Sequence, residues 1–445
     1  MAASDILDTI ESTCKVEKIT LLNGRQIWPL LRQKIIFEKI RESLGYDNKL
    51  RTRNKKQLVK NFFYGIKHLF HLKKFDFVFF NNTDKRILVD EKYYDIFFDA
   101  WADKVSQEKS LFIEWAKEAH INSSEVHSSN IISDLPFKLL IAFVSKFVNT
   151  KLKNESLLNE IIDSNKLSPS IKNDLKTKLA ETYVFKFFFR IIKPKAVFIL
   201  SSFTKVSIVV AAKELGIKVY EAQHGYIGDA HTFYNAEKQF KEAYPDYLLS
   251  FGTYEKQKAN PALIFKPEQI VPVGSFQLEL IKKHTTPKEL LNLQSKYSLV
   301  FCVTLQSIKE EEVLNWVLRE AQRHTDWLFV IRAKKGDMEY STYTQQDNII
   351  ECNDFSIYEV LKISDYNITI YSTTAIEGIF LGAAPIFFNV NNLSKNHFDV
   401  KKMNAIVVEE DELLTTDNLN KQAKKEHTFF VENYMENVNK TNLCF

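Results

Sequence analysis

Short apolar runs alternate with helix-like segments from about residue 183 onward. Residues 196–200 and 218–222 predict buried strands, and residues 205–215 predict a helix between them. These elements form a βαβ unit, so the two strands are expected to lie parallel. Other apolar runs predict further strands at residues 77–80, 111–115, 247–251, 270–273, 299–304, 327–331, 348–351, 366–370 and 385–390.

Apolar residues at helical spacing lie between many of these strands. They predict a mostly helical region at residues 137–179, helices at 309–324, 355–363 and 373–381, and a closing helix at 424–442. A polar stretch at residues 282–296 divides the pattern into two series, so we expect α/β domains at residues 76–296 and 297–445. Parallel sheets bind ligands beyond the carboxyl ends of their strands, which places the expected site between the domains.

Residues 1–75 precede the first domain and are expected to be helical. Within them, residues 51–75 carry eight Lys or Arg residues and no acid, and their apolar residues recur at helical spacing. Each basic residue near an anionic bilayer contributes about 1 kcal/mol, so this segment is a candidate membrane-binding surface. The alternative is that the stripe packs on the first domain. Gly65 favours a packed or kinked segment, because glycine in a helix costs about 1 kcal/mol relative to alanine.

Composition narrows the class of protein. The chain has 445 residues, of which 45% are hydrophobic and 26% charged, which excludes a disordered or collagen-like chain. Its four cysteines are scattered, so we expect neither a disulfide scaffold nor a structural zinc site. A net charge of only +4 argues against a nucleic-acid-binding protein. Without a long apolar run or a basic signal peptide, the chain is expected in the cytoplasm, able to bind the inner face of the membrane.

Glycine is unevenly distributed, which points to one region of the chain. Eight of the eleven glycines lie between residues 216 and 382. Because glycine allows tight turns and close approach of the backbone to a ligand, we expect the site in this stretch.

The first candidate site is the segment 221–228 (EAQHGYIG), at the end of the strand 218–222. There His224 is placed to donate to a phosphate oxygen or to accept a proton, and Gly225 beside it is a candidate for nucleotide-sugar binding. Asp229 and Glu221 are the second candidates for a general base. The alternative is a histidine that only ties a loop to the backbone.

The second candidate site is the segment 371–378 (YSTTAIEG), where a strand meets a helix. The free N–H groups and the dipole at a helix N-terminus favour an anion such as phosphate. A glutamate one turn later can accept from ribose hydroxyls. Helix capping alone explains one hydroxyl residue but not three. The candidate nucleotide-binding residues here are Tyr371, Ser372, Thr373, Thr374 and Glu377.

A third set of candidates stands at other strand ends that are expected on the same sheet edges. A cation at such an end can neutralise a diphosphate. This set consists of Gly274, Ser275, Thr304, Gln306, Arg332 and Lys334.

Several motifs are missing from the sequence. There is no GxGxxG after a strand, no P-loop, no GxSxG elbow and no HExxH. No DxD ends a strand, which argues against a metal-dependent transferase of that type. We therefore expect neither a bound metal nor a cofactor.

The two α/β domains, the Gln-His-Gly at residues 223–225 and the YSTTAIEG helix start followed by GAAP resemble glycosyltransferases of the GT-B fold. The likeness is closest to bacterial capsule and lipopolysaccharide transferases, including Kdo and alditol-phosphate transferases. Residues 23–32 (NGRQIWPLLR) are also similar to polysaccharide-biosynthesis proteins. The likeness covers residues 195–390 well. The alditol-phosphate enzymes carry Trp before His-Gly, where this chain has Gln223.

This resemblance implies two Rossmann-like domains facing across a cleft, with extra N-terminal helices. It implies transfer of a sugar from a nucleotide-activated donor to a cell-surface polysaccharide or glycolipid. A CMP-sugar such as Kdo or another ulosonic acid is favoured, and a UDP-sugar comes next. In such enzymes the His-Gly pair lies at the interdomain cleft, and the Ser/Thr-rich turn with its glutamate holds the nucleotide. Two alternatives remain: a non-hydrolysing nucleotide-sugar epimerase, and a non-catalytic nucleotide-sugar or glycan-binding protein.

Overall fold

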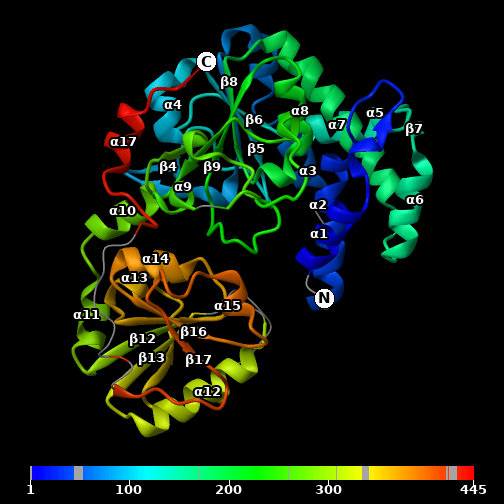
Figure 1. Ribbon diagram of the computed structural model, residues 1–445. Coiled ribbons are helices and arrows are strands. Elements are labelled where there is room, and N and C mark those ends of the chain that lie inside the picture. Colours follow the sequence, from blue (N-terminus) through cyan, green and yellow to red (C-terminus); the bar gives the residue numbers. More distant parts are fainter. Residues whose placement is uncertain are drawn as a thin grey trace.

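The computed structural model describes residues 3–44, 54–168, 170–258, 260–306, 308–332, 340–416, 419 and 428–444. The chain forms two α/β domains, each built on a parallel sheet (Figure 1). The first sheet has seven strands in the order β11-β10-β9-β8-β2-β5-β6. These are β2 (Phe77–Asn82), β5 (Ser110–Trp115), β6 (Ile131–Ser133), β8 (Ala196–Leu200), β9 (Lys218–Ala222), β10 (Tyr247–Ser250) and β11 (Ile270–Pro272).

The second sheet has six strands in the order β14-β13-β12-β15-β16-β17. All neighbouring strands in it are parallel. They are β12 (Leu299–Thr304), β13 (Trp327–Arg332), β14 (Ile349–Glu351), β15 (Tyr366–Thr369), β16 (Ala384–Phe388) and β17 (Ile406–Val408). The expected α/β class with two parallel sheets is confirmed.

The apolar runs become strands because both faces of each sheet are covered. In β8 all five residues are buried. Val197 and Ile199 belong to one core layer, while Phe198 and Leu200 belong to the layer on the opposite face. A parallel strand of this kind has no solvent face, so its sequence is continuously apolar rather than alternating.

The helices cover the sheets and connect their strands (Figure 1). In the first domain they are α4 (Asp99–Val105), α5 (Leu135–Ser145), α6 (Glu155–Ser164), α7 (Ile171–Ile192), α8 (Val206–Lys213), α9 (Tyr254–Gln257) and α10 (Phe276–Lys283). In the second they are α11 (Lys288–Gln294), α12 (Glu310–Arg323), α13 (Ile357–Ile363), α14 (Thr374–Leu381) and α15 (Leu393–His397). Helix α11 lies within the range expected for the first domain, but it contacts α13 of the second.

The N-terminal helices pack on the first domain. They are α1 (Ala3–Thr13), α2 (Trp28–Leu44) and α3 (Lys55–Phe63). Helix α2 contacts α7 and α8. After α3, Gly65 adopts a left-handed conformation with φ +68°, and a 3₁₀ segment, Ile66–Lys74, follows. The apolar stripe predicted over residues 51–75 is therefore kinked at this glycine.

Of the closing helix predicted at residues 424–442, residues 424–427 lie outside the described part of the chain, and the prediction for the rest is only partly correct. The helix found there, α17, spans Tyr434–Lys440. Residues 428–433 before it are not helical, and Asn433 at its start has φ +65°. Although α17 follows the second sheet in the chain, it packs on α4 and α10 beside the first sheet (Figure 1).

The sequence pattern did not reveal a small hairpin of β3 (Arg86–Val89) and β4 (Lys92–Asp95). It also missed the short pair β1 (Thr20–Leu21) and β7 (Leu152–Lys153). Among the described helices, none is long and apolar enough to cross a membrane.

An aromatic cluster joins the two domains. Phe430 lies between them, stacked on Phe251 of the first domain at 5.0 Å between ring centroids. It also contacts Phe380 of the second domain at 5.3 Å. Tyr226 and Phe398 make a similar pair, with their ring centroids 4.8 Å apart. The domains are thus held by apolar packing next to the cleft.

Candidate functional site

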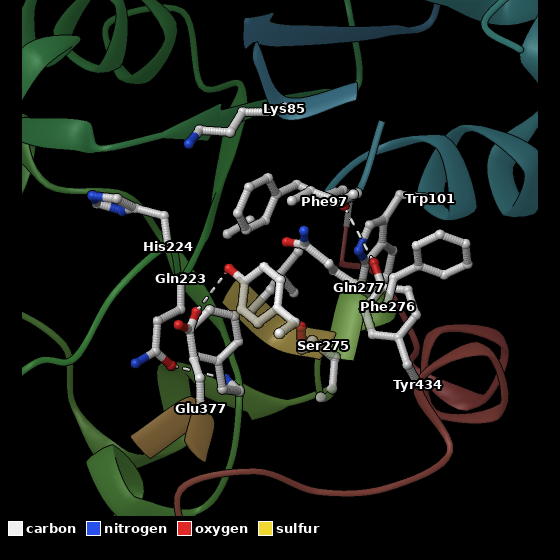
Figure 2. A pocket seen from close by; sticks show the side chains of 17 residues that line it. Lys85, Phe97, Trp101, Gln223, His224, Ser275, Phe276, Gln277, Glu377 and Tyr434 are labelled. Carbon is white, nitrogen blue, oxygen red and sulfur yellow. Dashed lines mark hydrogen bonds between the residues drawn. The ribbon is translucent and has the colours of Figure 1, made fainter. Parts of the chain in front are cut away.

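A cavity lies in the cleft between the domains (Figure 2). The first domain contributes the ends of β9 and β10 and the turn before α10, and the second contributes side chains of α13 and α14. Its polar lining residues are Lys85, Gln223, His224, Ser275, Gln277, Tyr358, Glu377 and Tyr434. The cavity encloses about 90 Å³, well below the roughly 300–1,000 Å³ of small-molecule sites, so a whole nucleotide-sugar needs the domains to separate.

His224 follows β9 and stands at the mouth of this cavity, where its side chain is exposed to the cleft and is flanked by residues of both domains. Its Nε2 lies 3.1 Å from the hydroxyl of Ser201, which ends β8 in a left-handed conformation. Desolvation in the cleft, with the nearby charges of Lys85 and Lys205, lowers the pKa of His224 to about 4. At neutral pH the imidazole is therefore uncharged and can accept a proton.

Lys85 was not predicted from the sequence, and it lies on the short turn after β2. Figure 2 shows its amino group turned toward the side of the cavity on which His224 lies. Its charge contributes to the lowered pKa of His224, and it opposes the rise in the pKa of Glu377 that burial causes. The polar end of β2 in the sequence was the only signal for this position.

Glu377 lines the cavity from the second domain, one turn into α14. Burial raises the pKa of its carboxyl group to about 7, against the opposing effects of the Tyr358 hydrogen bond and Lys85. Tyr358 donates to Glu377 Oε1 over 3.4 Å. The carboxyl group therefore titrates near neutral pH, where it can either accept or donate a hydrogen bond.

The two other candidate bases lie elsewhere. Glu221 is fully buried, and its Oε1 accepts from the Tyr234 hydroxyl at 2.6 Å and the Ser202 backbone N–H at 2.9 Å. Glu221 thus holds the loop that carries Ser201, and it does not line the cavity. Asp229 is exposed and pairs with Lys258 at 2.7 Å. Burial tends to raise the pKa of Asp229, but its hydrogen bond to Lys258 lowers it overall.

Gln223 fixes the backbone beneath His224. Its Oε1 accepts from the Phe251 N–H at 2.8 Å, and its Nε2 donates to Gly225 O at 2.9 Å and to Glu255 at 2.8 Å. Glu255 is buried, which raises the pKa of its carboxyl group to about 7. The glutamine thus ties β9, β10 and α9 together under the cleft.

Most of the described glycines between residues 216 and 382 lie where two segments distant in sequence come close together. A Cβ on Gly252 would lie 2.5 Å from Phe429 O, and one on Gly274 would lie 2.5 Å from Val431 O. Gly228 approaches the His397 carbonyl in the same way. We expected these glycines to mark close approach to a ligand, and the structure shows close approach to the protein backbone instead.

The hydroxyl residues at the start of α14 lie near the first domain. Thr373 Oγ1 accepts from the Tyr226 N–H at 3.3 Å, and it would be 3.2 Å from a Cβ on Gly225. Ser372 Oγ accepts from the N–H of Thr374, the first residue of α14, at 3.3 Å. Only Glu377 of this segment lines the cavity.

The remaining candidates at the second sheet are tied to the protein itself. Thr304 Oγ1 lies 3.0 Å from Thr374 Oγ1. Gln306 Oε1 accepts from the Tyr371 N–H at 2.9 Å. Arg332 donates to the Cys352 carbonyl. Lys334 lies outside the described residues.

The turn before α10 brings the last two candidates to the cavity. Gly274, at φ +96°, and Ser275 both line it. Ser275 caps α10 by accepting from the Leu278 N–H at 3.4 Å. Both residues therefore lie on the first domain's side of the cleft.

The N-terminal NGRQIWPLLR segment braces the loop that follows His224. Arg32 donates to the carbonyls of Thr232 at 2.6 Å and Asn235 at 2.7 Å. Its guanidinium also pairs with buried Glu11, which accepts from Trp28 Nε1 at 2.9 Å. The extra N-terminal helices thus position the 228–235 loop rather than the cavity itself.

Comparison with family models and curated proteins gives no match. Among solved structures, UDP-GlcNAc 2-epimerase from Methanocaldococcus jannaschii is 11% identical, with a TM-score of 0.47 over 81% of this chain and 97% of that one. The calicheamicin glycosyltransferase CalG4 is 10% identical, with a TM-score of 0.45 over 82% and 93%. MurG from Acinetobacter baumannii is 12% identical, with a TM-score of 0.40 over 78% and 88%. The chain is thus similar in fold, at low identity, to epimerases and glycosyltransferases alike, and these values carry no information on substrate or reaction.

Proposed function

We propose that the protein is a glycosyltransferase that moves a sugar from a nucleotide-activated donor to a cell-surface polysaccharide or glycolipid, without a metal ion. A CMP-sugar such as Kdo is the favoured donor, and a UDP-sugar comes next. One observation carries the proposal: His224 from the first domain and Glu377 from the second line a single cavity that also holds the Lys85 ammonium group. A neutral base, a hydroxyl-binding carboxyl group and a cation are the groups that such a transfer needs.

Each of these groups has a role in the proposal. Glu377 and the start of α14 hold the ribose and phosphate of the donor. Lys85 offsets the negative charge that grows on the departing phosphate, in place of a metal cation. His224 takes the proton of the acceptor hydroxyl. Binding of an anionic phosphate near Lys85 offsets its charge, which raises the pKa of His224 and strengthens it as a base.

We expect Glu377→Ala and Ser372→Ala each to weaken nucleotide binding about tenfold, which corresponds to roughly one hydrogen bond of 1.4 kcal/mol. Calorimetric titration with CMP and UDP measures this. Ser356→Ala is the matched control, because Ser356 caps α13 in the same domain away from the cavity. Unchanged nucleotide affinity in both site variants, with melting temperatures equal to that of the control, would refute the assignment.

We also propose that residues 51–75 bind an anionic membrane surface. Of the described part of this segment, Val59, Phe63 and Phe70 are exposed at 57%, 58% and 81%. Leu69 and Leu72 instead pack on the first domain. The exposed apolar surface continues on α5, which contacts α3 and presents Leu139, Leu140, Phe143 and Phe147 to solvent. An apolar face of this kind next to unopposed lysines is typical of an interfacial surface.

Co-sedimentation with vesicles tests this surface. We expect binding to anionic vesicles that falls with added salt and with Lys55, Lys56, Lys60 and Lys67 changed to Glu, at about 1 kcal/mol per lysine. Neutral phosphatidylcholine vesicles serve as the control. Equal recovery in the supernatant with and without anionic lipid would exclude the membrane role while leaving the transferase proposal intact.

The epimerase alternative makes a different chemical prediction. An epimerase converts the nucleotide-sugar with no acceptor present, whereas a transferase releases free nucleotide only when an acceptor is added. Product analysis of each nucleotide-sugar incubated alone separates the two. A thermal-shift screen of CMP, CDP, UDP and GDP compounds selects the donor first, because a ligand of the native state raises the melting temperature.

A further inference from the structure

A second, larger cavity lies in the first domain, on the face of the sheet covered by α5 and α7. It encloses about 340 Å³, within the range of small-molecule sites. The carboxyl ends of β2 and β5 and the start of α8 form its walls. Figure 1 shows α5 and α7 side by side next to this sheet.

The floor of this cavity is apolar. Phe137 of α5 stacks on Phe185 of α7 with ring centroids 5.3 Å apart, and Phe80 meets Phe185 edge-on at 5.3 Å. Trp115 stands at the end of β5, half-buried. Aromatic faces of this kind pack against the C–H groups of a sugar ring.

Three donors on the rim have no hydrogen-bond partner in the described residues: the Asn82 amide, the Trp115 indole N–H and the Lys205 ammonium group. The Asn81 amide, the Thr204 hydroxyl and the Lys138 ammonium group are paired, and Lys138 also lies 5.7 Å from the centre of the Trp115 ring. The two carboxylates present are already paired, Asp134 with Lys138 at 2.6 Å and Glu181 with Lys178 at 3.3 Å.

Lys205 makes no described ion pair although it lines this cavity. Desolvation lowers the pKa of Lys205, against the opposing charges of Glu181 and Asp134, since neither carboxylate forms an ion pair with its ammonium group in the described residues. An anionic oxygen placed in the cavity can pair with this ammonium group directly.

The second cavity also adjoins the interdomain site. The segment Ser201–Lys205 separates them: Ser201 contacts His224, while Thr204 and Lys205 line the second cavity. The charge of Lys205 reaches His224 and helps to lower its pKa. The second cavity and His224 thus lie on the two sides of this one short segment.

We infer that the second cavity binds an acidic saccharide, one that carries a carboxylate or a phosphate, as the acceptor of the transfer. The sugar ring packs on Trp115 and the phenylalanine floor, and its acidic group pairs with Lys205. The role of the bound saccharide as acceptor rests on the proposed function. The binding of an acidic saccharide in this cavity does not.

Binding of small probes to the full chain, followed by saturation-transfer NMR and calorimetry, tests this site. We expect methyl glucuronide and glucose 6-phosphate to bind at least tenfold more tightly than methyl glucoside. The stronger of the two acidic probes identifies the acidic group as carboxylate or phosphate. Lys205→Met should remove this preference, whereas Lys176→Met, on an exposed part of α7, should retain it. CMP or UDP affinity should stay unchanged in both variants.

A second variant covers the case in which Lys205→Met lowers folding yield. Trp115→Phe keeps an aromatic ring but removes the indole N–H and part of the stacking surface, so a three- to tenfold loss of probe affinity is expected. Equal binding of charged and uncharged glycosides, or no effect of either variant, would overturn the inference. Inorganic phosphate bound as tightly as glucose 6-phosphate would mean an adventitious ion only, which overturns it as well. Loss of nucleotide binding with probe binding retained would instead refute the transferase proposal.

Discussion

Replacement of His224 by alanine is expected to lower kcat by a factor on the order of 10² or more, with little change in nucleotide affinity. The imidazole is neutral at pH 7 because the pKa of His224 is lowered to about 4. It is held by Ser201 at the mouth of the cavity. Its loss removes a proton acceptor that acts in the transition state, so kcat falls more than donor binding does. Single-turnover kinetics and calorimetric titration measure the two effects separately.

The pH dependence of this activity has a definite sign. The neutral form accepts the proton, so kcat/KM should be lost as pH falls through about 4 and be flat on this account between pH 5.5 and 8. Lys85→Gln removes one of the positive charges that lower the pKa of His224, so the acid limb should move to higher pH. His284→Ala, at an exposed site after α10, is the control histidine. A His224→Ala variant that loses melting temperature but keeps its activity would show that the residue only braces its loop.

The strands could be predicted closely because a strand that is buried on both faces has a largely apolar sequence. The strands at residues 196–200, 218–222 and 299–304 begin and end at the predicted residues. The hairpin β3–β4 could not be predicted in this way. Its Arg86 is buried with Glu114 at 2.6 Å, and a buried ion pair looks like ordinary surface charge in a sequence.

The candidate site, like the fold, could be predicted from the sequence only in part. The meeting of His224 and Glu377 follows from two parallel sheets whose strand ends face each other, and the sequence predicts which residues stand at those ends. Lys85 could not be found, since an isolated lysine after a strand is usually solvated. Gly252 packs against the segment 428–431, which follows almost the whole second domain in the sequence. Short-range patterns hold no information on such a contact.

Replacement of Gly252 by alanine is expected to loosen the joint between the domains, at a cost of about 3 kcal/mol. Gly252 is buried, and an added Cβ would meet the Phe429 carbonyl oxygen at 2.5 Å. That carbonyl cannot move freely, because the flanking backbone is bonded to the same segment. The Tyr254 N–H donates to Thr428 O at 2.9 Å, and the Val431 N–H donates to Phe251 O at 2.8 Å.

The segment 428–431, which the added Cβ would displace, carries Phe430, and Phe430 packs between the domains. The cleft of the Gly252→Ala variant should therefore also be more open. We expect a melting temperature lower by roughly 5–10 °C, a larger radius of gyration in small-angle scattering, and transfer activity reduced about tenfold or more. Gly216→Ala is the matched control. Gly216 has φ +73° but open space around it, so it should cost only about 1 kcal/mol and leave the shape unchanged. Equal stability and equal radius of gyration in the two variants would mean that the segment 428–431 does not hold the domains together, and that closure of the cleft depends on the Tyr226–Phe398 contact instead.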